Sequence, residues 1–322
     1  MKVDGVRASA PGKVIITGEH FVVHGAYAVA AAIDRRATVT VSQSGDGESF
    51  IVARGRASRV ASDDQLFSAP KAVARRLFSE YGLRSPGLRI EIESTIPAGS
   101  GLGSSAAVSV ATAAALSRFM RYEADDDRLY EIAMAGEKKI HGSPSGIDIQ
   151  ASLRGGVILF SKNTGAKQIP LSEPIQLLVA HSGKQRKTSD LIRRASFRKD
   201  EYPDTLERLT QSASLFSLEA ATALSKCNLP YLGAIMNLMQ SALCWIGVSN
   251  RPLEDMVELA LSKDSSYGAK ITGAGGGGCI VVLPKPEKAE FLLRQMLNHY
   301  SDSFLCKIPQ SGVCWESEFE RQ

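Results

Sequence analysis

Four ionisable residues, Lys13, Glu19, His20 and His24, stand among glycines and aliphatic residues in the stretch SAPGKVIITGEHFVVHG (9–25). Charged side chains are rarely fully buried unless they are paired. The stretch is therefore either a first strand and turn with a polar rim, or one part of an active site. A partner group elsewhere in the chain would decide between these two interpretations.

A pair of carboxylates, Glu137 and Asp148, lies in the later stretch GEKKIHGSPSGIDIQAS, eleven positions apart. Glu137 falls near the end of an expected helix, and Asp148 follows a Gly-Ser-Pro-Ser-Gly break. The two could converge from different elements on one metal ion or one reacting hydroxyl. Asp148 taken alone fits the start of a helix equally well, because aspartate is a preferred helix-capping residue.

The segment PAGSGLGSSAAVSVATAAAL, which begins at Pro97, combines a glycine- and serine-rich loop with an apolar helix. Backbone N–H groups of such a loop, at the positive end of a helix, form a site for phosphate. The pattern is neither the Gly-x-x-x-x-Gly-Lys-Ser/Thr loop nor the dinucleotide fingerprint. The alternative is a flexible loop before a packing helix. Ser104 or Ser105 could cap that helix or bind Mg²⁺, which prefers oxygen ligands.

A second glycine cluster, KITGAGGGGCIVVL, begins at Lys270 and runs into an apolar strand. Four successive glycines (275–278) are costly in chain entropy. They suit a place where the backbone closely approaches a ligand or another backbone. A tight turn packed against another domain is the alternative, and both can hold together.

The elements that must position these residues are strands and helices mixed without strict βαβ alternation. We therefore expect an α+β fold rather than a doubly wound sheet. Residues 161–174 (SKNTGAKQIPLSEP) are rich in turn formers and form the candidate junction between domains 1–170 and 171–322. Periodicity and termination signals predict strands at 37–43, 88–94, 155–160 and 175–182, and helices at 68–82, 104–120 and 125–142.

Composition limits the possible classes of function. The chain has 322 residues, 22% of them charged, and a net charge of +4, so neither nucleic acid nor a membrane surface is required as a partner. No run of about 18 uncharged apolar residues is present. The five cysteines form no Cys-x-x-Cys pair and predict reduced, mostly buried thiols of a cytoplasmic protein. One basic run (182–199) is equally consistent with a solvated helix face and with a role near an anionic ligand.

Taken together, PGKVIITGEHFVVHG, PAGSGLGSSAA, HGSPSGID and KITGAGGGGC resemble, in order and spacing, the motifs of the GHMP kinase superfamily. The resemblance extends from about residue 8 to residue 282. The segment LGAIMNLMQSALCWIGVS (232–249) is similar to the helix that precedes the third family motif. The resemblance implies two domains: a mixed α/β N-terminal domain of the ribosomal-S5-domain-2-like type and a ferredoxin-like α+β C-terminal domain.

The resemblance also implies an activity: transfer of a phosphoryl group from ATP, with Mg²⁺, to a small alcohol. The motifs most resemble the branch that phosphorylates the C5 hydroxyl of (R)-mevalonate in isoprenoid biosynthesis. By position, Asp148 resembles the catalytic base, Lys13 its ion-pair partner, and Ser105 and Glu137 the metal-binding residues. Residues similar to the phosphate-binding loop are Pro97, Gly99, Ser100, Gly101, Leu102, Gly103, Ser104, Ser105 and Ala106. Residues similar to the substrate pocket are Lys13, Glu19, His20, Asp148, Thr272 and Gly273.

Departures from the family pattern leave alternatives open. Ile149 and Met239 stand where the family often has asparagine, which puts fine packing and substrate contacts in doubt. A phosphomevalonate kinase is the main alternative, because the basic run could meet a substrate phosphate. Other GHMP small-molecule kinases fit less well; galactokinases, for example, carry arginine where Lys13 stands. A non-catalytic sensor and a nucleic-acid-binding protein are further alternatives, and a homodimer is expected by analogy.

Overall fold

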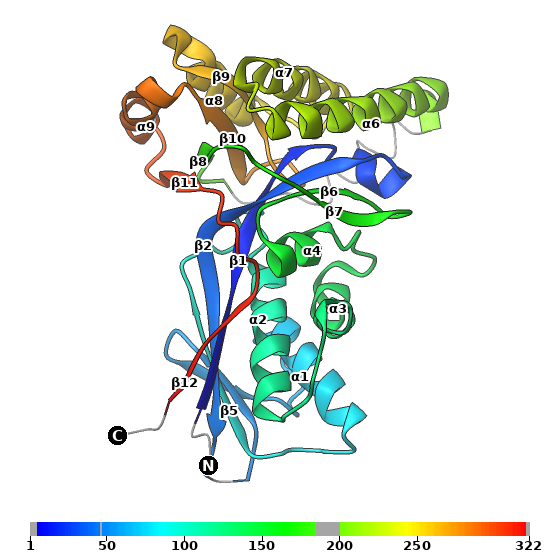
Figure 1. Ribbon diagram of the computed structural model, residues 1–322, viewed down its shortest axis with the longest axis vertical. Coiled ribbons are helices and arrows are strands. Elements are labelled where there is room, and N and C mark those ends of the chain that lie inside the picture. The colour runs from blue at the N-terminus through cyan, green and yellow to red at the C-terminus, as the bar shows by residue number, and fades with distance from the viewer. Residues whose placement is uncertain (1–4, 46, 185–199, 320–322) are drawn as a thin grey trace.

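The computed structural model describes residues 5–45, 47–184 and 200–319 of the chain, and its elements form two lobes, each built around one sheet (Figure 1). Most of the basic run lies outside the described residues. Among those described, no helix is both long and apolar enough to cross a bilayer.

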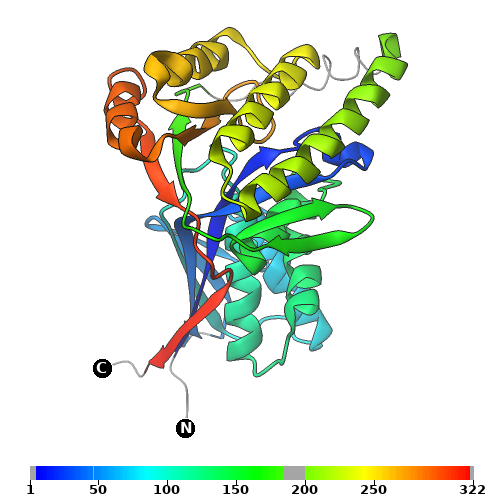
Figure 2. The same ribbon diagram turned by 45° about the horizontal axis from the view of Figure 1, so that its top comes forward.

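The first lobe contains a mostly antiparallel sheet in the order β12-β1-β2-β5-β3-β4, with β6 added beside β2 and β7 beside β6. The strands β1 and β2 are long and extend along the length of this sheet in both views (Figures 1 and 2). The strands are β1 (Gly5–Thr17), β2 (Ala28–Gln43), β3 (Phe50–Ala53), β4 (Arg56–Arg59), β5 (Leu88–Ser94), β6 (Val157–Ser161), β7 (Gly165–Ile169) and β12 (Cys314–Phe319).

Four helices cover one side of this sheet (Figure 1): α1 (Ser68–Glu80), α2 (Ser104–Phe119), α3 (Asp126–His141) and α4 (Ile147–Arg154). Helix α2 is rich in alanine, and most of its residues are buried. Small side chains let neighbouring helices and the sheet approach it closely, so α2 forms the centre of the main core. The phosphate-loop candidate leads directly into its first turn.

The second lobe has a four-stranded antiparallel sheet in the order β11-β8-β10-β9. Chain order is strand, helices, strand, strand, helix, strand, so the lobe is ferredoxin-like, as expected. Its elements are β8 (Gln176–His181), α6 (Pro203–Ser225), α7 (Leu229–Trp245), α8 (Arg251–Leu261), β9 (Ser266–Ile271), β10 (Cys279–Pro284), α9 (Ala289–Leu297) and β11 (Ser303–Lys307), with short 3-10 turns η2 (Ser262–Asp264) and η3 (Pro286–Lys288). A further 3-10 turn, η1 (Phe21–His24), connects β1 and β2 of the first lobe.

The sequence predicted the α+β class and most elements correctly, and the strand expected at 88–94 coincides with β5. Two expectations need correction. Segment 161–174 is not wholly turn, because β7 within it pairs with β6 as a hairpin. The cysteines are all free, but only Cys279 and Cys306 are buried, so the expectation of mostly buried thiols was wrong.

The last strand, β12, pairs antiparallel with β1, although it follows the whole second lobe in sequence. Arg36 of β2 fastens this return, since its guanidinium donates hydrogen bonds to the carbonyls of Gly312 (2.7 Å) and Ser9 (2.9 Å). The chain thus leaves the first lobe, builds the second and comes back. The domain boundary at 170/171 stays a prediction.

Candidate active site

A cavity of about 760 Å³ lies where β1, the loop before α2, the ends of α3 and α4, and the glycine-rich turn after β9 meet. Most of its wall belongs to the first lobe, and Gly273 and Ala274 come from the second. Its ionisable lining residues within the described chain are Lys13, Glu19, His20, Glu137, His141 and Asp148. The residues singled out by their chemistry in the sequence therefore surround one space.

Lys13 and Asp148, 135 positions apart in sequence, form an ion pair with 3.2 Å between Nζ and Oδ1. Lys13 is 3% exposed, whereas Asp148 is 30% exposed and faces the cavity. The ammonium also donates to the carbonyl of Gly101 (3.1 Å), and the backbone N–H of Lys13 donates to Leu102 (2.9 Å). Lys13 thereby joins the carboxylate of α4 to the loop before α2.

Asp148 lies in the first turn of α4, after Gly146. Gly146 has φ +91°, and a Cβ there would approach the Tyr130 hydroxyl to 2.2 Å, so only glycine lets the helix begin so close to α3. The Asp148 side chain pairs with Lys13 and makes no N-capping bond. A carboxylate near a helix N-terminus is stabilised by the helix dipole.

Ser105 and Glu137 form the second polar contact in the wall, where the Ser105 hydroxyl donates to Glu137 Oε1 at 2.6 Å. Gly136 makes this approach possible, because a Cβ there would lie 2.2 Å from Ser109 Oγ on α2. Burial raises the pKa of Glu137, while the Ser105 hydrogen bond opposes that rise. Ser105 therefore does not cap α2, which starts after Gly103 with no side-chain cap.

The hydroxyl of Ser105 and the carboxylate of Glu137 are oxygen donors of the kind that Mg²⁺ prefers. The described residues include no cluster of three His, Cys, Asp or Glu able to hold a metal. That donor set fits Mg²⁺ in particular, since this ion keeps several waters and takes its other ligands from substrate phosphates.

The loop before α2 has three glycines with positive φ, at Gly99 (+70°), Gly101 (+84°) and Gly103 (+74°). A Cβ on Gly103 would lie 2.9 Å from Lys13 Cγ, so the loop packs directly on the lysine stem. Of the nine residues predicted to bind phosphate, those that line the cavity are Gly99, Gly101, Gly103, Ser104 and Ser105, and those that stand behind the wall are Pro97, Ser100, Leu102 and Ala106.

The predicted substrate-pocket residues divide in the same way. Glu19, His20 and Gly273 line the cavity, and His20 Nε2 lies 3.0 Å from the carbonyl of Ala274. Thr272 is fully buried and does not line it. Its hydroxyl instead accepts a hydrogen bond from the backbone N–H of Ile15 (2.8 Å), which ties β1 to the second lobe.

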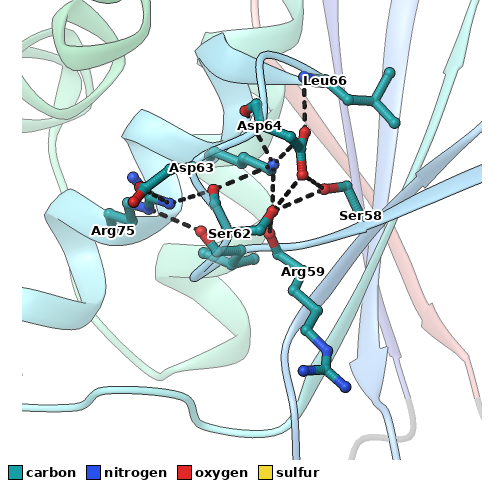
Figure 3. A network of polar contacts seen from close by, with 9 residues as sticks. Ser58, Arg59, Ser62, Asp63, Asp64, Leu66 and Arg75 are labelled. Carbon is teal, nitrogen blue, oxygen red and sulfur yellow. Dashed lines mark hydrogen bonds and ion pairs between the residues drawn. The ribbon is translucent and has the colours of Figure 1, made fainter.

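A further part of the wall, the segment between β4 and α1, was not predicted from the sequence. Its polar residues converge on Lys71, which is 3% exposed and donates to Asp64 Oδ1 and Ser62 Oγ, both at 2.8 Å. Figure 3 shows Ser58, Ser62 and Asp64 of this network with their side chains turned toward one another. Hydrogen bonding from Lys71 holds the pKa of Asp64 below its usual range. The network places Gln65 and Phe67 in the cavity wall.

Lys270 is the second residue whose importance the sequence did not show, although it opens a motif. It belongs to β9, is 0% exposed and pairs with Glu19 of the first lobe. Alternation along a short apolar strand gives no sign that a lysine points inward. The one hint of a buried ion pair in the sequence was that Lys270 stands among small and apolar residues (268–271).

Comparison with known proteins identifies the class to which this fold and site belong. Residues 68–156 match the model of the GHMP kinases N terminal domain, and residues 220–302 match the GHMP kinases C terminal model. The chain belongs to the GHMP kinase family.

Several relatives of the chain are named mevalonate kinase. A mevalonate kinase of Aeropyrum pernix is 36% identical over 319 residues, which cover 95% of this chain and 97% of the relative. One from Archaeoglobus fulgidus is 39% identical and covers 87% and 93%. The crystal structure of L. major mevalonate kinase in complex with R-mevalonate superimposes with a TM-score of 0.81 at 27% identity, covering 93% of this chain and 94% of that one.

Proposed function

We propose that the chain is an ATP-dependent kinase that phosphorylates the C5 hydroxyl of (R)-mevalonate and yields 5-phosphomevalonate. The observation that carries the proposal is the Lys13–Asp148 pair, which faces the same cavity as the Ser105–Glu137 contact. One pair suits an alcohol that must lose a proton, and the other suits the metal-bound phosphates of a nucleotide. The names of the relatives supply the identity of the alcohol.

In the proposed reaction the C5 oxygen attacks the γ-phosphorus of ATP, and the bond between that phosphorus and the β,γ-bridging oxygen breaks. Asp148 accepts the proton of the C5 hydroxyl through one carboxylate oxygen. Lys13, 3.2 Å away, holds that carboxylate in place and offsets negative charge near the reacting oxygen. Little basicity is required if the transition state is loose, since the proton then moves late.

The loop before α2 binds the phosphates through backbone N–H groups at the positive end of that helix. Ser105 and Glu137 would hold Mg²⁺, and the ion would supply positive charge to offset that of the phosphates. Apolar lining residues beyond the loop, among them Phe67, Ile92 and Val108, suit the adenine ring. We therefore place the nucleotide between the loop and the Lys71 network.

The charges of the cavity support an unphosphorylated acceptor over phosphomevalonate. Lys13 is the one lysine or arginine among its described lining residues, whereas Glu19, Glu137 and Asp148 are all acidic. A second phosphate-bearing substrate beside ATP would meet three carboxylates with a single opposing ammonium. Like charges in a shared site repel strongly where solvent is excluded.

We also propose a cytoplasmic homodimer. Five free cysteines suit a reducing compartment. Large apolar side chains are exposed on α6 and α7, including Leu215 (61%) and Leu238 (52%), and such surfaces are found at subunit contacts. Sedimentation of the purified protein tests the dimer.

Steady-state kinetics with ATP·Mg²⁺ and a panel of mevalonate, phosphomevalonate, galactose and homoserine tests the function. We expect turnover of mevalonate with phosphorus on O5, located by ³¹P NMR. A preference for phosphomevalonate, or nucleotide binding with no turnover of any alcohol, contradicts the proposal.

A further inference from the structure

Lys270 is a buried cation that the mechanism above does not use. Its ammonium contacts Glu19 Oε1, the carbonyl of Ile271 (2.6 Å) and the carbonyl of Ile15 (3.4 Å). A lysine ammonium has three N–H donors, and three acceptors surround this one. Lys270 therefore has no donor left for a ligand, and it acts on the cavity through Glu19.

Strand β9 is held by hydrogen bonds at the residues directly before and after Lys270. The side chain of Asn237 accepts from the N–H of Ala269, and that of Gln240 accepts from the N–H of Ile271, each at 3.0 Å. Both amides come from α7, which packs so closely on β9 that a Cβ on Gly233 would lie 2.4 Å from the Tyr267 backbone. These contacts give the Lys270 side chain a fixed origin in the second lobe.

Glu19 is 4% exposed, yet it lines the cavity. One carboxylate oxygen contacts Lys270, while the other, Oε2, is buried and has no hydrogen-bond partner within the described chain. A buried acceptor without a partner is costly. A hydroxyl donor on a ligand in the cavity would satisfy it.

We propose that Lys270 is a positioning residue that holds Glu19 in a fixed orientation, so that Oε2 accepts a hydrogen bond from the substrate hydroxyl that is not phosphorylated. The inference rests on the proposed function. Since Asp148 and Lys13 deal with the reacting hydroxyl, Glu19 is left to recognise the tertiary C3 hydroxyl of mevalonate. The pair then sets specificity for a branched dihydroxy acid over a simple primary alcohol.

The charged surroundings of Glu19 give this role a pH signature. Burial raises the pKa of Glu19, and Lys270 opposes the rise, with a smaller contribution from Lys13. His20 follows Glu19 in sequence, and Lys13 is itself paired with Asp148. Without Lys270, Glu19 stays protonated to higher pH. A neutral carboxyl accepts a weaker hydrogen bond than a carboxylate, so the loss in a Lys270→Met variant is greatest at low pH and narrows as the pH rises.

The test compares mevalonate with its 3-deoxy analogue, 5-hydroxy-3-methylpentanoate, in wild type, Lys270→Met, the double variant Glu19→Gln/Lys270→Met and the control Lys71→Met. We expect wild type to prefer mevalonate in kcat/KM by about tenfold or more, the scale of one charge-assisted hydrogen bond. Lys270→Met and the double variant should lower that ratio to within about threefold of unity. Lys71→Met, another buried lysine with a carboxylate partner, should leave the ratio unchanged.

The outcomes separate the two proposals. A wild type that phosphorylates mevalonate with no preference over the analogue overturns the role of Glu19, and an undiminished ratio in Lys270→Met overturns that of Lys270. A loss in Lys270→Met that is equal for both substrates and independent of pH assigns the lysine to structure alone. The double variant, which buries no charge at either position, keeps the test decisive if the single variant does not fold. A wild type inactive on mevalonate removes the proposed function and this inference with it.

Discussion

Two lysine–carboxylate pairs lie beside the same cavity, and their surroundings differ. In the Lys13–Asp148 pair the carboxylate is 30% exposed and open to the cavity. In the Lys270–Glu19 pair the lysine is 0% exposed and the carboxylate 4%, and the two residues come from different lobes. In the proposed mechanism the first pair exchanges a proton with the substrate, whereas the second, which is closed to solvent, positions a carboxylate.

Burial explains why the same two groups serve different purposes. Burial raises the pKa of Glu19 and lowers that of Lys270, in each case against the effect of the partner. Removing two charges from water costs more than their attraction returns in many buried pairs. Such a pair is therefore a feature that favours function at the expense of stability.

The largest expected effect comes from disrupting the Lys13–Asp148 pair. Asp148→Asn and Lys13→Met should each lower kcat by about 10² or more, the scale of lost acid–base or electrostatic assistance. Single-turnover phosphoryl transfer measures this loss, with circular dichroism as the control for folding. A folded Asp148→Asn enzyme with near wild-type turnover would disprove the catalytic role.

Disrupting the Lys270–Glu19 pair should instead act mainly on the free energy of unfolding. Lys270→Met leaves a buried carboxylate without its partner, which costs about 3–5 kcal/mol, whereas Glu19→Gln/Lys270→Met should recover most of that loss or exceed wild type. Urea denaturation of both variants measures the difference. Equal destabilisation by the single and double changes would show that shape rather than charge decides this site.

The stability difference between the double variant and wild type should also depend on pH. Because the folded pKa of Glu19 lies above 4.5, wild type gains stability as the pH falls through that folded value toward 4.5, and loses it as the pH rises. The double variant lacks this titration. Its advantage near pH 7 should therefore shrink toward pH 4.5, as urea midpoints across that range would reveal. A pH-independent difference contradicts the assignment.

The Ser105–Glu137 contact has a smaller expected effect than either lysine–carboxylate pair, although Glu137 (2% exposed) is as buried as Glu19 (4%). Glu137→Gln removes the carboxylate that we propose as a metal ligand, so the Mg²⁺ concentration required for half-maximal rate should rise several-fold, with a smaller change in KM for mevalonate. Ser105→Ala is the matched variant on the other side of the contact. Unchanged metal titrations in both would leave Glu137 as a helix-end carboxylate only.

Substitution of Lys71 should have the smallest effect on the kinetics. Unlike substitution of Lys270, it should affect ATP rather than mevalonate. Lys71→Met frees Asp64 and Ser62 from the network in Figure 3, and the segment that carries Phe67 loses its support. We expect KM for ATP to rise about two- to fivefold, with KM for mevalonate unchanged. A change of this size corresponds to the free energy lost with one or two partly exposed hydrogen bonds. Initial rates at varied ATP measure it, and a shift in KM for mevalonate alone contradicts it.

The sequence predicted the residues that are exposed to the cavity better than those that support it. Lys13, Glu137 and Asp148 stood out because charge next to glycine breaks is visible in a linear pattern. The ion pair between Lys270 and Glu19 could not be predicted from the sequence, because it depends on how β9 of the second lobe lies against the residues that follow β1 in the first lobe. Thr272 shows the converse, since its place in a glycine motif suggested a pocket residue, yet its hydroxyl is used by Ile15.

The return of β12 to β1 has a consequence for how the molecule is made. Residues 314–319 leave the ribosome after the entire second lobe, so β1 must wait as an open sheet edge while the intervening chain is synthesised. Unpaired edges are sites of wrong association. The second lobe is thus inserted in sequence between two strands of one sheet, and that sheet is complete only after the whole of the second lobe has been synthesised.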